Sequence, residues 1–207
     1  MSGKIEISRR AFAGGVVAAL AGGAALAQPR LTGESPMGPF YPLVHGPDAD
    51  ADLTRVAGRT GRARGQVIEV GGRVLDRFGK PVEGAKAALW QANAAGRYDH
   101  PNDPATMPLD PDFQGYAELV TGADGEWRIT TVRPAAYESP IGTRPPHIHF
   151  DVRGRTHRLA AQMYFPEDAE ANAADVLYRQ LGSEGPTSVA SLVADHRYRW
   201  DIVLMDG

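Results

Sequence analysis

The stretch of sequence that decides the fold is QVIEVGGRVLDRFGKP, residues 66–81. Residues 66–76 are rich in valine, isoleucine and leucine, and Phe78-Gly79-Lys80-Pro81 is typical of the tight turn that ends a strand. Short runs of the same kind recur outward from it, over residues 85–92, 116–121, 126–132, 147–153, 158–165 and 198–204. Many short strands at close spacing indicate an antiparallel sandwich or barrel, and we predict an all-β, antiparallel β-sandwich.

Two further segments have other patterns. Residues 28–64 are rich in Pro, Gly and Asp and contain Gly38-Pro39-Phe40-Tyr41-Pro42, so we expect an irregular N-terminal arm that docks through its aromatic pair. Residues 166–181 have apolar residues at helical spacing, which predicts one or two short helices near the C-terminus, with the acids at 167–175 on a solvated face. The predicted division is a leader at 1–27, the arm at 28–64 and one β-sandwich domain at 65–207.

The first 27 residues are typical of an export signal. Ser8-Arg9-Arg10-Ala11-Phe12 precedes a run of Ala, Gly, Val and Leu, and Ala25-Leu26-Ala27 has the small residues of a cleavage site. The apolar run is shorter than the roughly 20 residues of a membrane-spanning helix, although an anchor is the alternative. We therefore predict a twin-arginine signal, export of the folded protein to the periplasm or the medium, and no membrane association after cleavage.

Composition limits the kinds of partner and site. The chain has 207 residues and a formal net charge of −3, so it lacks the basic field that holds nucleic acid. It has no cysteine, which excludes disulfides, thiolate metal sites and cysteine nucleophiles. A small-molecule partner is therefore expected, and any metal ion must be bound by imidazole, carboxylate or phenolate groups.

The motif Arg144-Pro145-Pro146-His147-Ile148-His149-Phe150 places two histidines one residue apart in an expected strand. Successive side chains of a strand alternate between its faces, so His147 and His149 should share one face while Ile148 and Phe150 enter an apolar one. Two imidazoles on one face are half of a metal site. A pair of surface histidines is the alternative.

Two tyrosines, Tyr98 and Tyr137, lie in segments rich in Gly or Pro, at residues 93–98 and 133–140. With these segments the sequence resembles the intradiol ring-cleavage dioxygenases, the family of protocatechuate 3,4-dioxygenase and catechol 1,2-dioxygenase. The resembling segments follow the family's order and cover nearly all of the chain after the leader: residues 89–98, 109–113, 144–150, 162–165 and 198–204.

The resemblance implies a non-haem iron(III) site. Its ligands in this sequence would be Tyr98, Tyr137, His147 and His149, with Tyr137 in the place of the tyrosine that leaves the metal when substrate arrives. Two phenolates and two neutral imidazoles suit a hard ferric ion and leave one net positive charge, which a catecholate dianion can approach favourably.

The resemblance also implies pocket residues. Arg144 takes the place of an arginine that stabilises negative charge on the ring during oxygen attack, and Gln162 that of a glutamine that hydrogen-bonds substrate or oxygen. Tyr41 and Trp90 are expected to line the substrate pocket, although Trp90 could instead be a core residue. The arm motif at Tyr41 can border a pocket in its own chain or in a partner, which allows a homo-oligomer.

The implied reaction is cleavage of a catechol-type ring between its two hydroxyls by dioxygen, giving a muconate-type diacid; the ring substituents stay open. Two other functions are alternatives. One is a non-catalytic transthyretin-like β-sandwich binding module, which residues 72–85 and 124–134 also resemble. The other is a zinc hydrolase that would need a third His or a carboxylate beside His147 and His149.

The remaining histidines are expected at the surface or beside the ligands: His45, His100, His157 and His196.

Overall fold

The computed structural model describes residues 28–43 and 48–206. The predicted signal at 1–27 and residue His45 lie outside the described residues. The described elements follow one another in this order: β1 (Val67–Asp76), β2 (Lys86–Trp90), β3 (Tyr116–Val120), β4 (Glu126–Val132), β5 (Tyr137–Ser139), β6 (Gly142–Arg144), β7 (His147–Arg153), β8 (Arg158–Tyr164), the 3-10 helix η1 (Pro166–Asp168), α1 (Ala169–Ala174), α2 (Val176–Gln180), the 3-10 helix η2 (Gly182–Ser188), β9 (Ser191–Ala194), β10 (Arg197–Arg199) and β11 (Ile202–Leu204).

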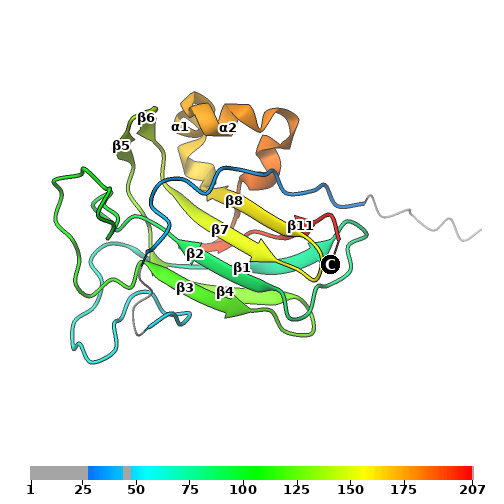
Figure 1. Ribbon diagram of the computed structural model, residues 1–207, viewed down its shortest axis with the longest axis horizontal. Helices are drawn as coiled ribbons and strands as arrows, with labels where there is room; N and C mark the ends of the chain where they lie inside the picture. The colour runs from blue at the N-terminus through cyan, green and yellow to red at the C-terminus, as the bar shows by residue number, and fades with distance from the viewer. Residues whose placement is uncertain (1–27, 44–47, 207) are drawn as a thin grey trace, which may run out of the picture.

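Two β-sheets form the body of the protein (Figure 1). In the five-stranded sheet, β1 pairs antiparallel with β4 and parallel with β10 and β11, and β9 extends the sheet from β10. The four-stranded sheet has the order β3-β2-β7-β8 and is antiparallel throughout. The all-β sandwich with short helices near its C-terminus is therefore confirmed, while the parallel pairing of β1 with β10 and β11 departs from the predicted antiparallel pattern.

The core lies between the two sheets and takes side chains from alternate strand positions. It includes Leu89 of β2 and Phe150 of β7, neither of which has any exposed surface. Because Ile148 and Phe150 face this core, His147 and His149 point from the opposite, outer face of the four-stranded sheet, as the alternation in β7 predicted.

The N-terminal arm covers this outer face. The Ser35 amide donates to the Ala160 carbonyl of β8 at 2.8 Å, and the Thr32 amide donates to the Val203 carbonyl of β11 at 3.1 Å. Figure 1 shows the arm, in blue, running along β8 beneath the helices. Phe40 is only 4% exposed, so the arm docks through its aromatic residues, on the same sheet face that carries the two histidines.

The predicted final strand, residues 198–204, is two strands in the structure. β10 and β11 both pair with β1, and Trp200 and Asp201 separate them. The Trp200 carbonyl approaches β1 so closely that a Cβ atom on Gly72 would lie 1.8 Å from it, and the Arg73 amide donates to the Asp201 carboxylate at 3.0 Å. The break depends on a glycine in a distant strand, so the residues of the segment itself do not reveal it.

Residues 166–181, predicted as helical, form short helices that break at Asp175. This residue has an extended backbone, with φ −68° and ψ 130°, and its carboxylate caps α2 by accepting from the Leu177 amide at 3.3 Å. Asp175 is 3% exposed, so the predicted solvated face is wrong for this acid. Among the described residues, no helix has the length and apolar character needed to cross a membrane.

Residues 137–144 form a small hairpin, β5–β6, that begins within the proline-containing segment around Tyr137. In its register Tyr137 lies directly opposite Arg144. The hairpin projects from the sandwich near the helices (Figure 1). This one hairpin therefore carries two predicted site residues, Tyr137 and Arg144.

Candidate active site

Four side chains that could hold a metal converge on the outer face of the four-stranded sheet. The Nε2 atoms of His147 and His149 are 3.1 Å apart, and the Tyr98 hydroxyl lies 3.1 Å from Nε2 of His149. The Tyr137 ring lies 5.3 Å from that of Tyr98 and 5.6 Å from that of His147, between centroids. All four predicted ligands are thus brought together, from β7, β5 and the segment after β2.

The neighbours of the two histidines fix their ring orientation. Nδ1 of His147 lies 2.6 Å from the Pro145 carbonyl, which can only accept, so Nδ1 carries the proton and Nε2 keeps its lone pair. The His149 ring stacks on Trp90, with centroids 4.9 Å apart and planes 7° from parallel. The two Nε2 atoms face each other at a separation where two lone pairs repel, unless a proton or a cation lies between them.

A tight turn at residues 93–97 positions Tyr98 at the site. The Asn93 side chain accepts from the amides of Ala95 at 2.8 Å and Arg97 at 3.1 Å, which closes the turn. Gly96 has φ +78°, and a Cβ atom there would lie 2.4 Å from a backbone carbonyl of the segment that leads into β5. Glycine is therefore required where the two tyrosine-bearing segments meet.

Burial controls the protonation of the four candidate ligands. Burial, followed by the charge of Arg144, lowers the pKa of His147 to about 3. Burial, followed by His147 and Arg144, also lowers the pKa of His149 well below its usual range. Burial raises the pKa of Tyr98 and of Tyr137. The imidazoles are therefore neutral donors, and the phenols would ionise near neutral pH only beside a further positive charge.

The donor set fits a metal ion. Metal–nitrogen and metal–oxygen bonds of about 2.0–2.1 Å, at angles between 90° and 109°, would put two ligand atoms about 2.8–3.4 Å apart, which agrees with both 3.1 Å separations. Within residues 28–43 and 48–206, no group of three or more His, Cys, Asp or Glu side chains is arranged to hold a metal. The third ligand that a zinc hydrolase needs is missing from the described residues, and the groups that join the two histidines are phenols.

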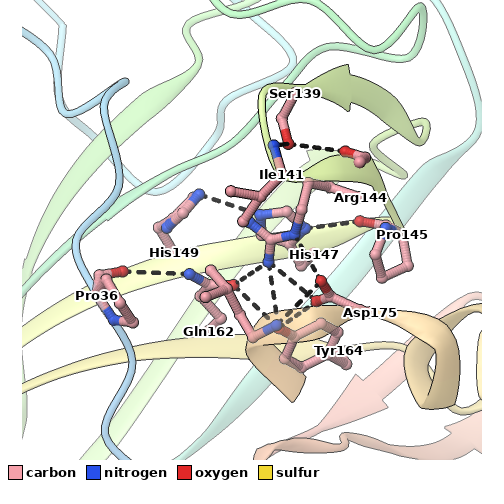
Figure 2. A network of polar contacts seen from close by, with 12 residues as sticks. Pro36, Ser139, Ile141, Arg144, Pro145, His147, His149, Gln162, Tyr164 and Asp175 are labelled. Atoms are coloured by element: carbon pink, nitrogen blue, oxygen red, sulfur yellow. Dashed lines mark hydrogen bonds and ion pairs between the residues drawn. The ribbon is translucent and has the colours of Figure 1, made fainter. Parts of the chain in front are cut away.

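The Arg144 guanidinium lies beside these ligands in a buried polar network (Figure 2). Nε and Nη2 donate to the two carboxylate oxygens of Asp175 at 3.0 and 3.1 Å, and Nη2 also donates to Oε1 of Gln162 at 2.6 Å. Burial opposes the charge of Arg144, but Tyr137, Asp175 and Tyr164 raise its pKa above the ordinary value. The guanidinium is therefore a permanent positive charge next to the phenols.

The other predicted pocket residues, Trp90 and Tyr41, lie at different distances from the candidate ligands. Trp90 is buried and stacks on His149, so it supports a candidate ligand from the site side of the sheet. Tyr41 packs edge-on against Trp90, with centroids 4.9 Å apart, one ring further from the candidate ligands. Phe40 instead lies against both phenol rings, 4.7 Å from Tyr98 and 5.9 Å from Tyr137.

Sequence analysis overlooked three residues of this site. Asp175 and Tyr164 bind Arg144, and Phe40 covers the phenols. Phe40 had a signal as half of the aromatic pair in the arm, and Tyr164 lies in the resembling segment 162–165, whereas Asp175 was hidden among solvated acids. His100, expected at the surface or beside the ligands, is buried with its ring 5.8 Å from that of Phe40.

The fold and the site together define a β-sandwich that brings together two histidines and two tyrosines, a donor set that could hold a metal ion. Residues 37–206 match a family model described as Dioxygenase. The chain therefore belongs to the intradiol ring-cleavage dioxygenase family.

Individual relatives agree with this assignment. The chain is 48% identical over 124 residues to the protocatechuate 3,4-dioxygenase beta chain of Burkholderia cepacia, a match that covers 58% of this chain and 53% of that one. It is 32% identical over 120 residues to hydroxyquinol 1,2-dioxygenase of Rhizobium sp. (strain MTP-10005), covering 51% and 39%. The matched region thus spans about half of the first of these proteins and less of the second.

Among solved structures, the dioxygenase domain of a dioxygenase carbohydrate-binding protein fusion from Streptomyces sp. SirexAA-E superposes with a TM-score of 0.63 at 27% identity. The match covers 86% of this chain and all of that domain. The 3-chlorocatechol 1,2-dioxygenase of Rhodococcus opacus 1CP has a TM-score of 0.65 at 22% identity, covering 84% and 72%, and supports the fold.

Proposed function

We propose that this chain is an iron(III) dioxygenase that opens a catechol-type ring between its two hydroxyls, with Tyr98, Tyr137, His147 and His149 as the iron ligands. The observation that carries the proposal is the convergence of two neutral imidazoles and two buried phenols beside a fixed guanidinium. A transthyretin-like binding module would have no use for this convergence.

The choice of iron(III) rests on the chemistry of the donors. Phenolate oxygen is a hard anionic donor, which favours a ferric ion over softer or less charged metals. When bound, the iron would supply the positive charge that ionises the two phenols and would hold both oxygens of the substrate. Two phenolates would then neutralise two of its three charges and favour the ferric state.

The residues of the site have separate tasks in this proposal. Tyr137, on its short hairpin, would help to hold the iron in the absence of substrate, and its phenolate oxygen would accept a proton from a substrate hydroxyl when substrate binds. Arg144 would stabilise the negative charge that develops on the ring during reaction with dioxygen. Gln162 would hydrogen-bond substrate or oxygen, and Trp90 and Tyr41 would line the pocket. Phe40 and Trp90 together would keep water from the phenols.

The test is a product analysis with isotopically labelled dioxygen. Iron-loaded protein is incubated with catechol, protocatechuate or hydroxyquinol under ¹⁸O₂, and the products are examined by mass spectrometry. We expect one of these substrates to give a muconate-type diacid that has gained two ¹⁸O atoms, with one dioxygen consumed per ring. An intact ring with all three substrates, or a ring opened outside the two hydroxyls, would contradict the proposal.

We also propose that the protein is exported in folded form by the signal at residues 1–27, on the basis of Arg9, Arg10 and the small residues before Gln28. Replacing both arginines with lysine should leave the protein in the cytoplasm, which cell fractionation would detect. A variant that still reaches the periplasm would contradict this route. Association into a homo-oligomer stays a separate proposal, because the arm makes its described contacts within its own chain and does not by itself call for a partner.

A further inference from the structure

Asp175 is a buried acid whose position helix formation alone does not explain. It lies at the break between α1 and α2, in a segment whose neighbouring acid Glu170 is exposed. Its side chain is 1% exposed, and that of Arg144 is 5% exposed. An asparagine or serine would cap α2 as well as an aspartate does, so the cap does not account for a buried charge.

The contacts of Asp175 fix the plane of the Arg144 guanidinium. The carboxylate binds Nε and Nη2 in parallel, at 3.0 and 3.1 Å, which is the geometry that most restricts an arginine. The Tyr164 hydroxyl lies 2.9 Å from Oδ2 of Asp175, 3.0 Å from Oε1 of Gln162 and 3.3 Å from Nη2. Figure 2 shows these side chains gathered around the guanidinium, on the side away from Ser139.

The same network fixes Gln162. Its Oε1 accepts from Nη2 of Arg144, and its Nε2 donates to the Pro36 carbonyl of the arm at 3.2 Å. The hydrogen bonds of Arg144 within the described part of the chain use only Nε and Nη2. Nη1 is therefore the nitrogen left to act on a ligand.

We propose that Asp175 is a positioning residue: through its paired hydrogen bonds, supported by Tyr164, it holds the Arg144 guanidinium so that Nη1 is presented to the reacting ring. The inference rests on the proposed function and adds a residue to it. A buried ion pair contributes little net stability compared with well-packed apolar side chains. Orientation of a catalytic charge is a better reason for this one, because small displacements of such a group cost rate.

The first variant is Asp175→Asn, which keeps the shape and the helix cap but removes the charge and one acceptor oxygen. We expect kcat for ring opening to fall by about 10- to 100-fold, with KM and the visible absorption of the iron-loaded protein unchanged. The matched control is Glu170→Gln, which removes an exposed acid from α1 and should leave kcat as it is. A normal kcat in Asp175→Asn would overturn the inference.

A double-mutant cycle separates positioning from a general structural role. If Asp175 acts only through Arg144, Asp175→Asn should lower kcat no further once Arg144→Ala is present. The double variant should also regain thermal stability lost in Arg144→Ala alone, since it no longer buries an unpaired carboxylate. Additive losses of kcat would overturn the positioning role. Tyr164→Phe, which removes one supporting hydroxyl, is the second variant if Asp175→Asn fails to fold, and it should lower kcat without changing KM.

Failure of the inference can be told apart from failure of the proposed function. If wild-type protein opens a catechol ring and Asp175→Asn does so equally well, only the inference is wrong. If wild-type protein opens no catechol ring, the proposed function is wrong. The thermal stabilities of Arg144→Ala, Asp175→Asn and the double variant would then still test whether Asp175 holds Arg144. Additive losses of thermal stability would show that it does not.

Discussion

Replacement of Arg144 with alanine is expected to lower kcat for ring opening by about 100- to 1,000-fold, the loss typical of removing one fixed donor to transition-state charge. The guanidinium is buried, permanently charged and held by Asp175 and Gln162, so it needs no rearrangement to act. Steady-state kinetics on iron-loaded protein measure the effect. Iron content should stay the same, because Arg144 is not one of the four candidate ligands.

Two further variants control for the loss of charge. Arg144→Lys keeps the charge but lacks the planar fork that matches the Asp175 carboxylate, so its activity should lie between those of wild type and Arg144→Ala. Arg158→Ala removes an arginine that pairs with Asp151 beyond the site and should leave kcat unchanged. An Arg144→Ala variant that is folded, contains iron and turns over at the wild-type rate would contradict the role of Arg144.

Replacement of Tyr98 with phenylalanine is expected to remove most of the visible colour and most of the iron. Tyr98 is buried, and its hydroxyl lies 3.1 Å from Nε2 of His149, so the change removes one of the two proposed phenolate ligands. An absorption spectrum with iron analysis measures both effects. The aromatic ring remains, and with it the packing against Phe40, so the fold should persist.

The matched control for this change is Tyr116→Phe. Tyr116 is also buried, in the aromatic cluster beneath the arm, but its hydroxyl donates to Glu118 at 2.5 Å. This variant should keep both its colour and its iron. Equal colour in Tyr98→Phe and wild type would show that Tyr98 is not a ligand and would move the metal site elsewhere.

Features set by alternation along one strand could be predicted from the sequence. The placement of His147 and His149 on one face, with Ile148 and Phe150 in the core, follows from the two-residue period of β7 alone. Most strand runs of the two sheets were predicted from their apolar residues and the turns between them, but β9 was not, and the docking of the aromatic arm was predicted from Phe40 and Tyr41. Convergence of both tyrosines with the histidines needed the family resemblance, because no local pattern links residues so far apart.

Features set by contacts between distant segments could not be predicted. The break between β10 and β11 depends on Gly72, and the buried position of Asp175 depends on Arg144. Glu170 and Asp175 are both acids in one short helical segment, and only the fold makes one exposed and the other a partner of the guanidinium. The hairpin that pairs Tyr137 with Arg144 is likewise too short to have a strand pattern of its own.

The most direct test of the central claim is the visible absorption spectrum of the purified protein, with its iron content, before and after addition of catechol or protocatechuate under argon. We expect a red-brown band from charge transfer between phenolate and iron(III), which shifts when one of these compounds binds. A protein that stays colourless after reconstitution with ferric iron would contradict the iron–tyrosinate centre and the dioxygenase function proposed from it.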